Sequence, residues 1–94
     1  MALLCLKVIR GVLELPDNDE TTLYVAVKVE NLKAFSTHVI GARPIWEQEF
    51  FFEISRIDLG VEIELWEKGF LWDKIWIQTK IKLYFIRYKS ARRG

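Results

Sequence analysis

The sequence predicts an all-β protein, built as an antiparallel β-sandwich. Apolar and polar side chains alternate with a period of two in short runs along most of the chain, as in strands that turn one face toward a core. Turn-forming residues separate these runs, for example at PDNDE (16–20) and GARP (41–44). No long stretch follows the helical period. Short alternating strands joined by turns are typical of antiparallel sandwiches.

Six segments carry the strand pattern. In residues 23–30, Val25 and Val27 share one face, and Lys28 and Glu30 lie on the other. The other segments alternate in the same way, with their apolar residues on a single face. The expected strands cover residues 3–8, 23–30, 37–40, 46–55, 61–66 and 77–83.

The stretch ARPIWEQEFFFEI (42–54) places a tryptophan at the start of a strand. Pro44 lacks a backbone N–H group, so it belongs in a turn or at the first position of a strand. Trp46 has the same parity as Phe50 and Phe52. We therefore expect Trp46 to be a large core residue that fills the entry of the strand.

Length and composition favour one small domain. A chain of 94 residues suits a single domain with little stability to spare, and its 51% of hydrophobic residues excludes a disordered chain. No apolar run approaches the roughly 20 residues of a membrane-spanning helix. The single cysteine, Cys5, cannot form an internal disulfide. We therefore expect a reducing, intracellular setting and a packing role for its side chain.

No motif in the sequence is typical of an enzyme. His38 is the only histidine, and we expect it to be exposed or half-buried on a strand. The chain has no nucleophile elbow, no glycine-rich phosphate loop and no C-x-x-C pair. Glu62, Glu64 and Glu67 are expected to form a solvated stripe. We predict a binding protein with no catalytic activity and no cofactor.

Charge is distributed unevenly along the chain. Residues 1–73 hold 7 basic and 13 acidic side chains, a net charge of −6. Residues 74–94 hold 7 basic and no acidic side chains, a net charge of +7. This change marks the clearest internal boundary. We expect residues 1–83 to form the sandwich and residues 84–94 to form a basic tail.

The stretch around Trp46 also resembles a known family. PIWEQEFFFEI is similar to the proline–x–tryptophan–x–x–x–phenylalanine–x–phenylalanine signature of the C2 domain, the second conserved region of protein kinase C. The resemblance is greatest to one branch, the amino-terminal C2 domain of the uncoordinated-thirteen presynaptic vesicle-priming proteins. It implies an eight-stranded β-sandwich whose end loops often bind calcium and acidic lipid. The matching segments are MALLC (1–5), YVAVKVENLK (24–33), RPIWEQEFFFEISRIDLG (43–60) and VEIELWEKGFLWD (61–73).

The resemblance also locates the positions at which calcium-binding members of the family carry aspartates. Calcium takes six to eight oxygen ligands, so a loop short of carboxylates binds it poorly. Here Thr22 replaces the first residue of an aspartate–proline–tyrosine motif, and Gly69 stands where another carboxylate is expected. We therefore expect calcium-independent binding and no metal site. The degenerate calcium-loop positions are Asp17, Thr22, Glu67, Gly69 and Asp73.

The resemblance implies protein partners. In the resembled branch the domain looks like a self-associating module, which exchanges its own homodimer for a complex with the zinc finger of a presynaptic active-zone scaffold. The matching NLK motif implies that Lys33 lies at that interface. The adjoining strand face bears Tyr24, Lys28 and Glu30, and flat mixed-charge faces can associate about a two-fold axis. We expect a cytoplasmic protein, peripheral at the presynaptic plasma membrane, that acts in exocytosis.

The resemblance to that branch ends near Asp73. The glycine that the family places four residues later is Ile77 here, and the final two strands of the sandwich have no counterpart. We therefore expect a C2-type β-sandwich that lacks its last two strands, with residues 74–94 as an alternative ending. A sandwich shortened in this way exposes sheet edges and part of its core.

Two alternatives remain open. The basic residues after Asp73 are interleaved with aromatic ones, and this pattern can bind an anionic membrane surface. Nucleic acid is not expected, because the chain has no stacking motif. The second alternative is a truncated isoform without a function of its own. The basic residues of the lipid alternative are Lys80, Lys82, Arg87, Lys89, Arg92 and Arg93.

Overall fold

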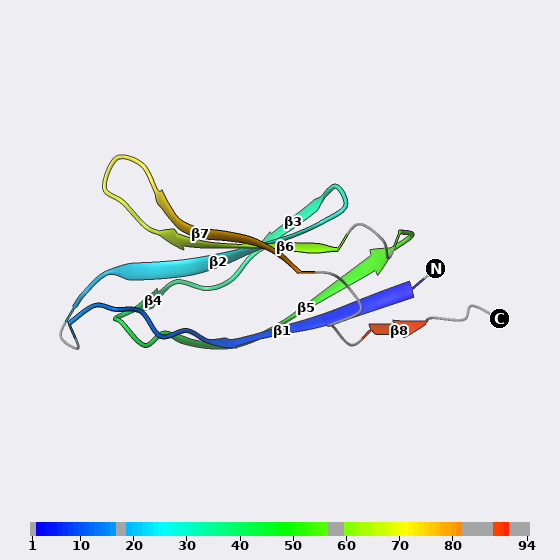
Figure 1. The fold of residues 1–94 in the computed structure, drawn as a ribbon, viewed down its shortest axis with the longest axis horizontal. Coiled ribbons are helices and arrows are strands. Elements are labelled where there is room, and N and C mark those ends of the chain that lie inside the picture. The colour runs from blue at the N-terminus through cyan, green and yellow to red at the C-terminus, as the bar shows by residue number, and fades with distance from the viewer. Residues whose placement is uncertain (1, 17–18, 57–59, 82–87, 91–94) are drawn as a thin grey trace.

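Two antiparallel β-sheets face each other in the computed structural model, which describes residues 2–16, 19–56, 60–81 and 88–90 (Figure 1). All regular secondary structure in these ranges is β-strand. The same ranges contain no helix of the length and apolar character needed to cross a bilayer. The predicted all-β antiparallel sandwich is confirmed.

The first sheet has the strand order β5-β1-β8. β1 (Ala2–Arg10) pairs antiparallel with β5 (Ile45–Ile54) along most of its length. β8 (Tyr88–Ser90) pairs with the first residues of β1. The strands expected at 3–8 and 46–55 correspond to β1 and β5. β8 falls in the segment that we expected to be a tail, since three residues are too few for an alternating pattern to be recognised.

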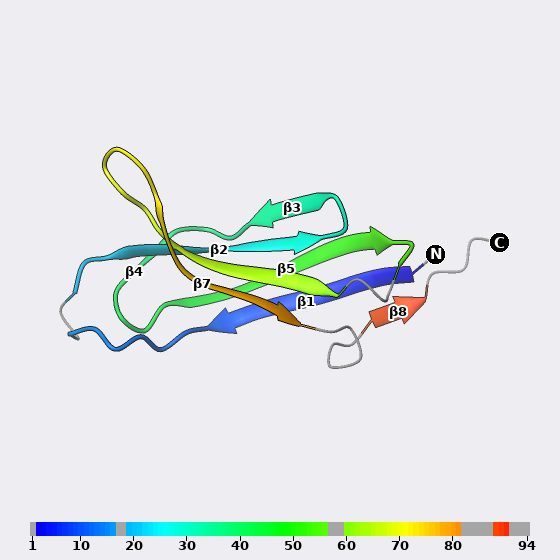
Figure 2. The ribbon, with the colours of Figure 1, turned by 45° about the horizontal axis from the view of Figure 1, so that its top comes forward.

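The second sheet has the strand order β3-β2-β6-β7, with the short β4 beside β2 (Figure 2). All of these pairs are antiparallel. The sequence pattern missed β3, whose side chains are mostly exposed and show no clear alternation. The strands are β2 (Thr22–Val29), β3 (Leu32–Phe35), β4 (Val39–Ile40), β6 (Val61–Glu67) and β7 (Lys74–Ile81).

The turn between β2 and β3 moves Glu30 away from the strand face on which we expected it. Glu30 has a φ of 54°, so the backbone leaves the extended conformation at this residue. Its carboxylate accepts hydrogen bonds from the backbone N–H groups of Ser55 and Arg56, both at 2.8 Å. These bonds lower the pKa of Glu30 and tie the β2–β3 turn to the end of β5. The predicted place of Glu30 on the face with Lys28 is therefore wrong.

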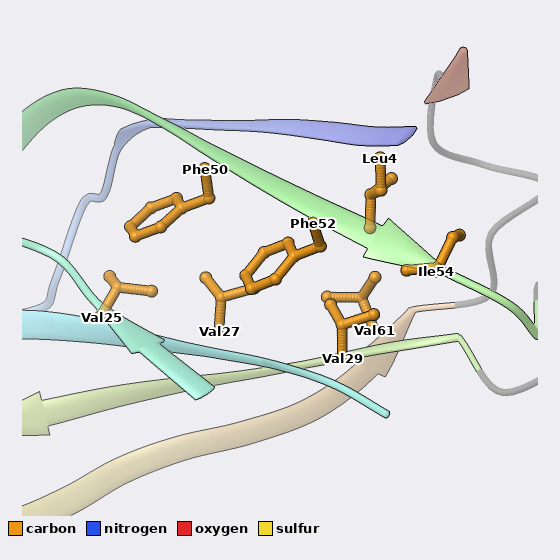
Figure 3. Packing of buried hydrophobic residues seen from close by; sticks show 8 residues of the cluster. All are labelled: Leu4, Val25, Val27, Val29, Phe50, Phe52, Ile54 and Val61. Atoms are coloured by element: carbon orange, nitrogen blue, oxygen red, sulfur yellow. The ribbon is translucent and has the colours of Figure 1, made fainter. Parts of the chain in front are cut away.

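The core lies between the two sheets (Figure 3). Phe50 and Phe52 project from β5 toward Val25 and Val27 of β2, as the shared parity of each run predicts. Each such side chain stabilises the fold by about 1.5–3 kcal/mol when it is fully buried. The eight buried residues of the cluster are Leu4, Val25, Val27, Val29, Phe50, Phe52, Ile54 and Val61.

Trp46 lies at the margin of this core. It is half-buried against the cluster, and its Nε1–H donates to the Thr37 carbonyl at 3.0 Å. The pairing of β1 with β5 shifts register beside it, and Glu47 has a φ of 47°, which marks a β-bulge. The expected packing role of Trp46 at the strand entry therefore holds, with the indole N–H satisfied by the backbone.

Candidate functional site

The second sheet has one face toward the core and one face that points away from it. On the far face, Lys33 of β3, Lys28 of β2 and Glu62 of β6 occupy neighbouring positions across the strands. Two residues further along β3 and β6 stand Phe35 and Glu64. Basic, acidic and aromatic side chains therefore lie next to one another on one sheet face. We call it the outer face and define it by Lys28, Lys33, Phe35, Glu62, Glu64, Trp66 and Ile75.

An ion pair lies at the centre of the outer face. The Lys33 Nζ lies 3.2 Å from Glu64 Oε1, and it also lies over the rings of Phe35 and Trp66, at 5.5 and 6.0 Å from their centroids. The lysine side chain remains 40% exposed. The predicted position of Lys33 on an accessible sheet face is thus observed, and its ammonium group is held by aromatic and acidic neighbours. Its role at an interface stays a prediction.

We expected Glu64 to belong to a solvated stripe. That expectation is wrong, because Glu64 is only 7% exposed. Its carboxylate accepts hydrogen bonds from Trp66 Nε1 at 3.1 Å and from Gln78 Nε2 at 3.3 Å, in addition to the pair with Lys33. Burial raises the pKa of Glu64, but the hydrogen bonds from Trp66 and Lys33 and the charges of Lys33 and Lys28 outweigh burial and lower it overall. Glu64 is therefore held ionised beneath the side chain of Lys33.

Tyr24 is buried, so the expectation that its side chain is presented on the sheet surface is wrong. Its ring packs against His38 at 4.8 Å between centroids, stacks on Trp66 at 6.4 Å, and meets Phe35 edge-on at 6.1 Å. Its hydroxyl donates to Asp73 Oδ2 at 2.5 Å. Burial, followed by this hydrogen bond, raises the pKa of Tyr24 to about 12. Tyr24 thus links β2 to the loop between β6 and β7.

Asp73 accepts two hydrogen bonds and forms one ion pair within the protein. Besides the Tyr24 hydroxyl, the Gly69 N–H donates to Oδ1 at 3.1 Å, and Lys68 Nζ lies 3.7 Å from the same oxygen. The Tyr24 hydrogen bond is the main reason why the pKa of Asp73 is lowered. A Cβ at position 69 would overlap the carbonyl of Trp72, so the loop admits only glycine there. The carboxylate missing at this calcium-loop position is therefore excluded by the backbone itself.

The other degenerate calcium-loop positions are also engaged or lie elsewhere. Glu67 accepts the indole N–H of Trp76 at 2.9 Å, and the Thr22 carbonyl accepts the N–H of Lys68 at 2.8 Å. Asp17 lies outside the described residues. Within the described ranges, no three acidic, histidine or cysteine side chains gather in a group that suits a metal ion. Glu67 and Asp73 are the nearest candidates for ligands, and both are used as hydrogen-bond acceptors.

The loop between β6 and β7 carries an apolar tip that the sequence analysis did not single out. Phe70, Leu71 and Trp72 are 101%, 75% and 75% exposed. Lys68 and Lys74 flank them. The loop projects away from the body of the sandwich (Figure 1). Three consecutive apolar residues within a turn were the signal that could have identified this tip, and we call Phe70–Trp72 the apolar tip.

A comparison with protein families decides the classification. The C2 domain family matches residues 2–87 of the chain. The chain belongs to the C2 domain family. The match continues beyond Asp73, where the resemblance to the uncoordinated-thirteen branch had faded. It does not support that narrower branch.

One solved structure similar to this C2 domain comes from work on CC2D1B, which coordinates ESCRT-III activity during the mitotic reformation of the nuclear envelope. The two share 22% of their residues and superpose with a TM-score of 0.74. The match covers 87% of this chain and 41% of the other, so the C2 domain spans less than half of that protein chain. At this level of identity, the likeness shows that the two chains share a fold.

The basic residues of the lipid alternative do not form one described cluster on this C2 domain. By their backbone positions, Lys80 lies near the end of β7 and Lys89 lies in β8, on different sheets. The others, Lys82, Arg87, Arg92 and Arg93, lie outside the described residues.

The Tyr24–Asp73 hydrogen bond predicts a pH-dependent contribution to stability. Because the folded pKa of Asp73 is lowered, this contribution is fully present above the unfolded pKa, near 3.9, and is lost as the pH falls through the folded value. We expect Tyr24→Phe to lower the urea midpoint near neutral pH, and the difference from wild type to shrink in acid. Urea denaturation across the acidic range measures this.

Asp73→Asn and the double variant complete a thermodynamic cycle for this pair. The two changes should be strongly non-additive near neutral pH. A Tyr24→Phe effect that is independent of pH, together with additive changes, would show that the bond contributes nothing.

Proposed function

We propose that this C2 domain is a calcium-independent protein-interaction module that self-associates through its outer face. The observation that carries this proposal is the arrangement of opposite charges across neighbouring strands. Lys28 and Lys33 lie toward the β3 side, and Glu62 and Glu64 lie on β6. A two-fold axis that lies between two facing copies and runs parallel to the strands places the basic side of one copy against the acidic side of the other.

Aromatic side chains add contact area next to these charges. Phe35 is 55% exposed on β3, and Trp66 lies half-buried beside Lys33. Aromatic residues dominate the buried centres of protein interfaces, whereas charged pairs at the rim contribute mostly to orientation and association rate. The outer face therefore offers both kinds of contact in one patch.

The chemistry of the end loops supports calcium-independent binding. The oxygens of Asp73 and Glu67 accept hydrogen bonds from Tyr24 and Trp76, and Gly69 has no room for a carboxylate. Calcium needs six to eight oxygen ligands, and this loop has too few carboxylates for that. Binding at the outer face requires no ion, because its charges come from the protein itself.

We further propose that the chain is the amino-terminal C2 domain of an uncoordinated-thirteen vesicle-priming protein, acting in exocytosis at the presynaptic plasma membrane. The support is the order and spacing of the segments YVAVKVENLK and RPIWEQEFFFEISRIDLG, with Lys33 in the NLK motif. In that setting the homodimer would give way to the zinc finger of an active-zone scaffold. If that zinc finger also binds the outer face, Lys33→Glu should block its binding as well.

Light scattering after size exclusion tests self-association over a concentration series. We expect the 11.1-kDa chain to reach the mass of a dimer as concentration rises. Lys33→Glu places a carboxylate beside Glu64 and should raise the dimer dissociation constant about ten-fold or more, which corresponds to 1.4 kcal/mol or more. Lys7→Glu, an exposed lysine on the other sheet, is the matched control and should change nothing.

Thermal melts accompany this test, because Lys33 also holds Glu64 within one chain. Lys28→Glu changes the same face without removing that ion pair, and it should weaken the dimer while the melt is retained. A chain that stays monomeric at all concentrations, or a dimer unaffected by both variants, contradicts the proposal.

A second function, binding to an anionic membrane, is favoured by the apolar tip. Phe70 and Trp72 project into solvent between Lys68 and Lys74. Aromatic side chains enter the membrane interface readily, and each nearby basic residue adds about 1 kcal/mol of attraction to anionic lipid. This loop, rather than the basic tail, is the described part of the chain that best suits contact with lipid.

Sedimentation with vesicles of phosphatidylcholine and phosphatidylserine tests the lipid function. Phe70→Ser with Trp72→Ser should reduce binding by about ten-fold or more, since each buried aromatic side chain contributes about 1.5–3 kcal/mol. Phe51→Ser, which changes a 60% exposed phenylalanine on β5, should leave binding intact. Equal losses in both variants, or binding that requires calcium, would refute this mode of binding.

A further inference from the structure

The ammonium group of Lys33 lies in a small cage of aromatic rings and one carboxylate on the outer face. Its Nζ lies over the rings of Phe35 and Trp66 and 3.2 Å from Glu64 Oε1. β2 runs between these groups, where Ala26 stands in register with both Phe35 and Glu64 and is fully buried. A methyl group at this position leaves room above the strand for a cation. We define the cation cage by Ala26, Phe35, Glu64 and Trp66.

Lys33 can leave the cation cage without dismantling it. The lysine side chain is 40% exposed, and ion pairs made by so exposed a lysine contribute little to stability because water solvates the free ammonium well. The carboxylate of Glu64 is held in place by other donors, Trp66 Nε1 at 3.1 Å and Gln78 Nε2 at 3.3 Å. The ring of Trp66 stacks on Tyr24. Lys33 is therefore an exchangeable occupant of a cage that other contacts build.

The chemistry of the cage favours a cation that donates no hydrogen bonds. Both oxygens of Glu64 already accept hydrogen bonds from Trp66 and Gln78, so an incoming ammonium or guanidinium group finds few acceptors for its N–H groups. A trimethylammonium group needs no acceptor, and it loses less hydration on entering the cage. Aromatic faces attract such groups electrostatically when the cation lies within about 6 Å of the ring centroids. The position of Lys33 Nζ meets this condition for both rings.

Two lysines beside the cage suit an anionic group carried by the same ligand. Lys28 and Lys33 stand opposite each other on β2 and β3, and both are exposed. Glu62 lies beyond Lys28 on β6, on the side away from Lys33. Once displaced from the cage, the Lys33 ammonium remains next to Lys28, and the two together attract a phosphate group.

We propose that the cation cage binds phosphocholine. The trimethylammonium group replaces the Lys33 ammonium between the rings of Phe35 and Trp66, and its charge takes over the pairing with Glu64. The phosphate group pairs with Lys28 and the displaced Lys33. All of these groups come from one copy of the chain, so the inference does not rest on the self-association proposed above.

The test titrates the full chain with phosphocholine and follows tryptophan fluorescence, at a concentration where light scattering shows a monomer. We expect saturable binding, about ten-fold or more tighter than that of phosphoethanolamine, whose primary ammonium needs acceptors. Phe35→Ala removes an exposed wall of the cage and should weaken binding by a similar factor. Ala26→Leu fills the cage and should abolish binding. Lys7→Ala, on the other sheet, is the matched control and should change nothing.

Choline, which has no phosphate, separates the two halves of the site. Lys33→Ala removes the internal competitor, so choline should bind this variant about ten-fold or more tightly than it binds the wild-type chain. Lys28→Ala removes the same charge from the same face but does not vacate the cage. It should change choline binding little and should weaken phosphocholine binding. Thermal melts of each variant show that the fold is retained.

Vesicles of pure phosphatidylcholine identify the source of the headgroup. Sedimentation that Phe35→Ala reduces points to a lipid headgroup, whereas binding of free phosphocholine alone points to a soluble ligand. The proposal is overturned if phosphoethanolamine binds as tightly as phosphocholine, if Phe35→Ala has no effect, or if Lys33→Ala does not tighten choline binding. It is also overturned if a trimethyl-lysine peptide binds at the cage and phosphocholine does not.

Discussion

The structure depends on burial of β2 on both of its faces. Val25 and Val27 pack into the core beneath Phe50 and Phe52. On the other face Ala26 is fully buried and Tyr24 nearly so. A strand in this position must be apolar over most of its length, and YVAV satisfies that requirement. The phenolic hydroxyl of Tyr24 then needs a partner, because a buried donor without one costs about 1–3 kcal/mol.

Asp73 is that partner, so the carboxylate of the β6–β7 loop is engaged with Tyr24. In a calcium-binding loop this carboxylate would bind the ion. In this domain it fixes the β6–β7 loop to β2. The same principle applies at Glu64, whose buried charge is satisfied by Lys33. Because the carboxylates of the end loop are engaged internally, the surfaces that we propose for binding are the outer face and the apolar tip.

Much of the fold could be predicted from sequence, because side-chain parity within a strand is a local property. Alternation located β1, β2, β5, β6 and β7, and it predicted Trp46 as a core residue, which the structure places half-buried against the core cluster. Tyr24 was misplaced because its burial depends on Asp73, which lies 49 residues away in the chain. Glu64 was misplaced for the same kind of reason, since its environment is set by β3 and β7.

Other features lie beyond what alternation can show. Glu30 lies off the strand face because its φ angle is positive, and β8 is only three residues long. The candidate interface was predicted at Lys33 through resemblance to a family. The exposure of the apolar tip was established only in three dimensions, although three consecutive apolar residues within a turn were a signal for it in the sequence.

The central claim is that the acidic groups of the end loop serve the fold and do not bind calcium. The most direct test is the melting temperature in excess calcium and in excess chelator. We expect the same melting temperature in both conditions. Calcium at 100 times its dissociation constant would stabilise the native state by about 2.7 kcal/mol. For a domain of this size that corresponds to a rise of roughly 10 °C or more, and such a rise would contradict the claim.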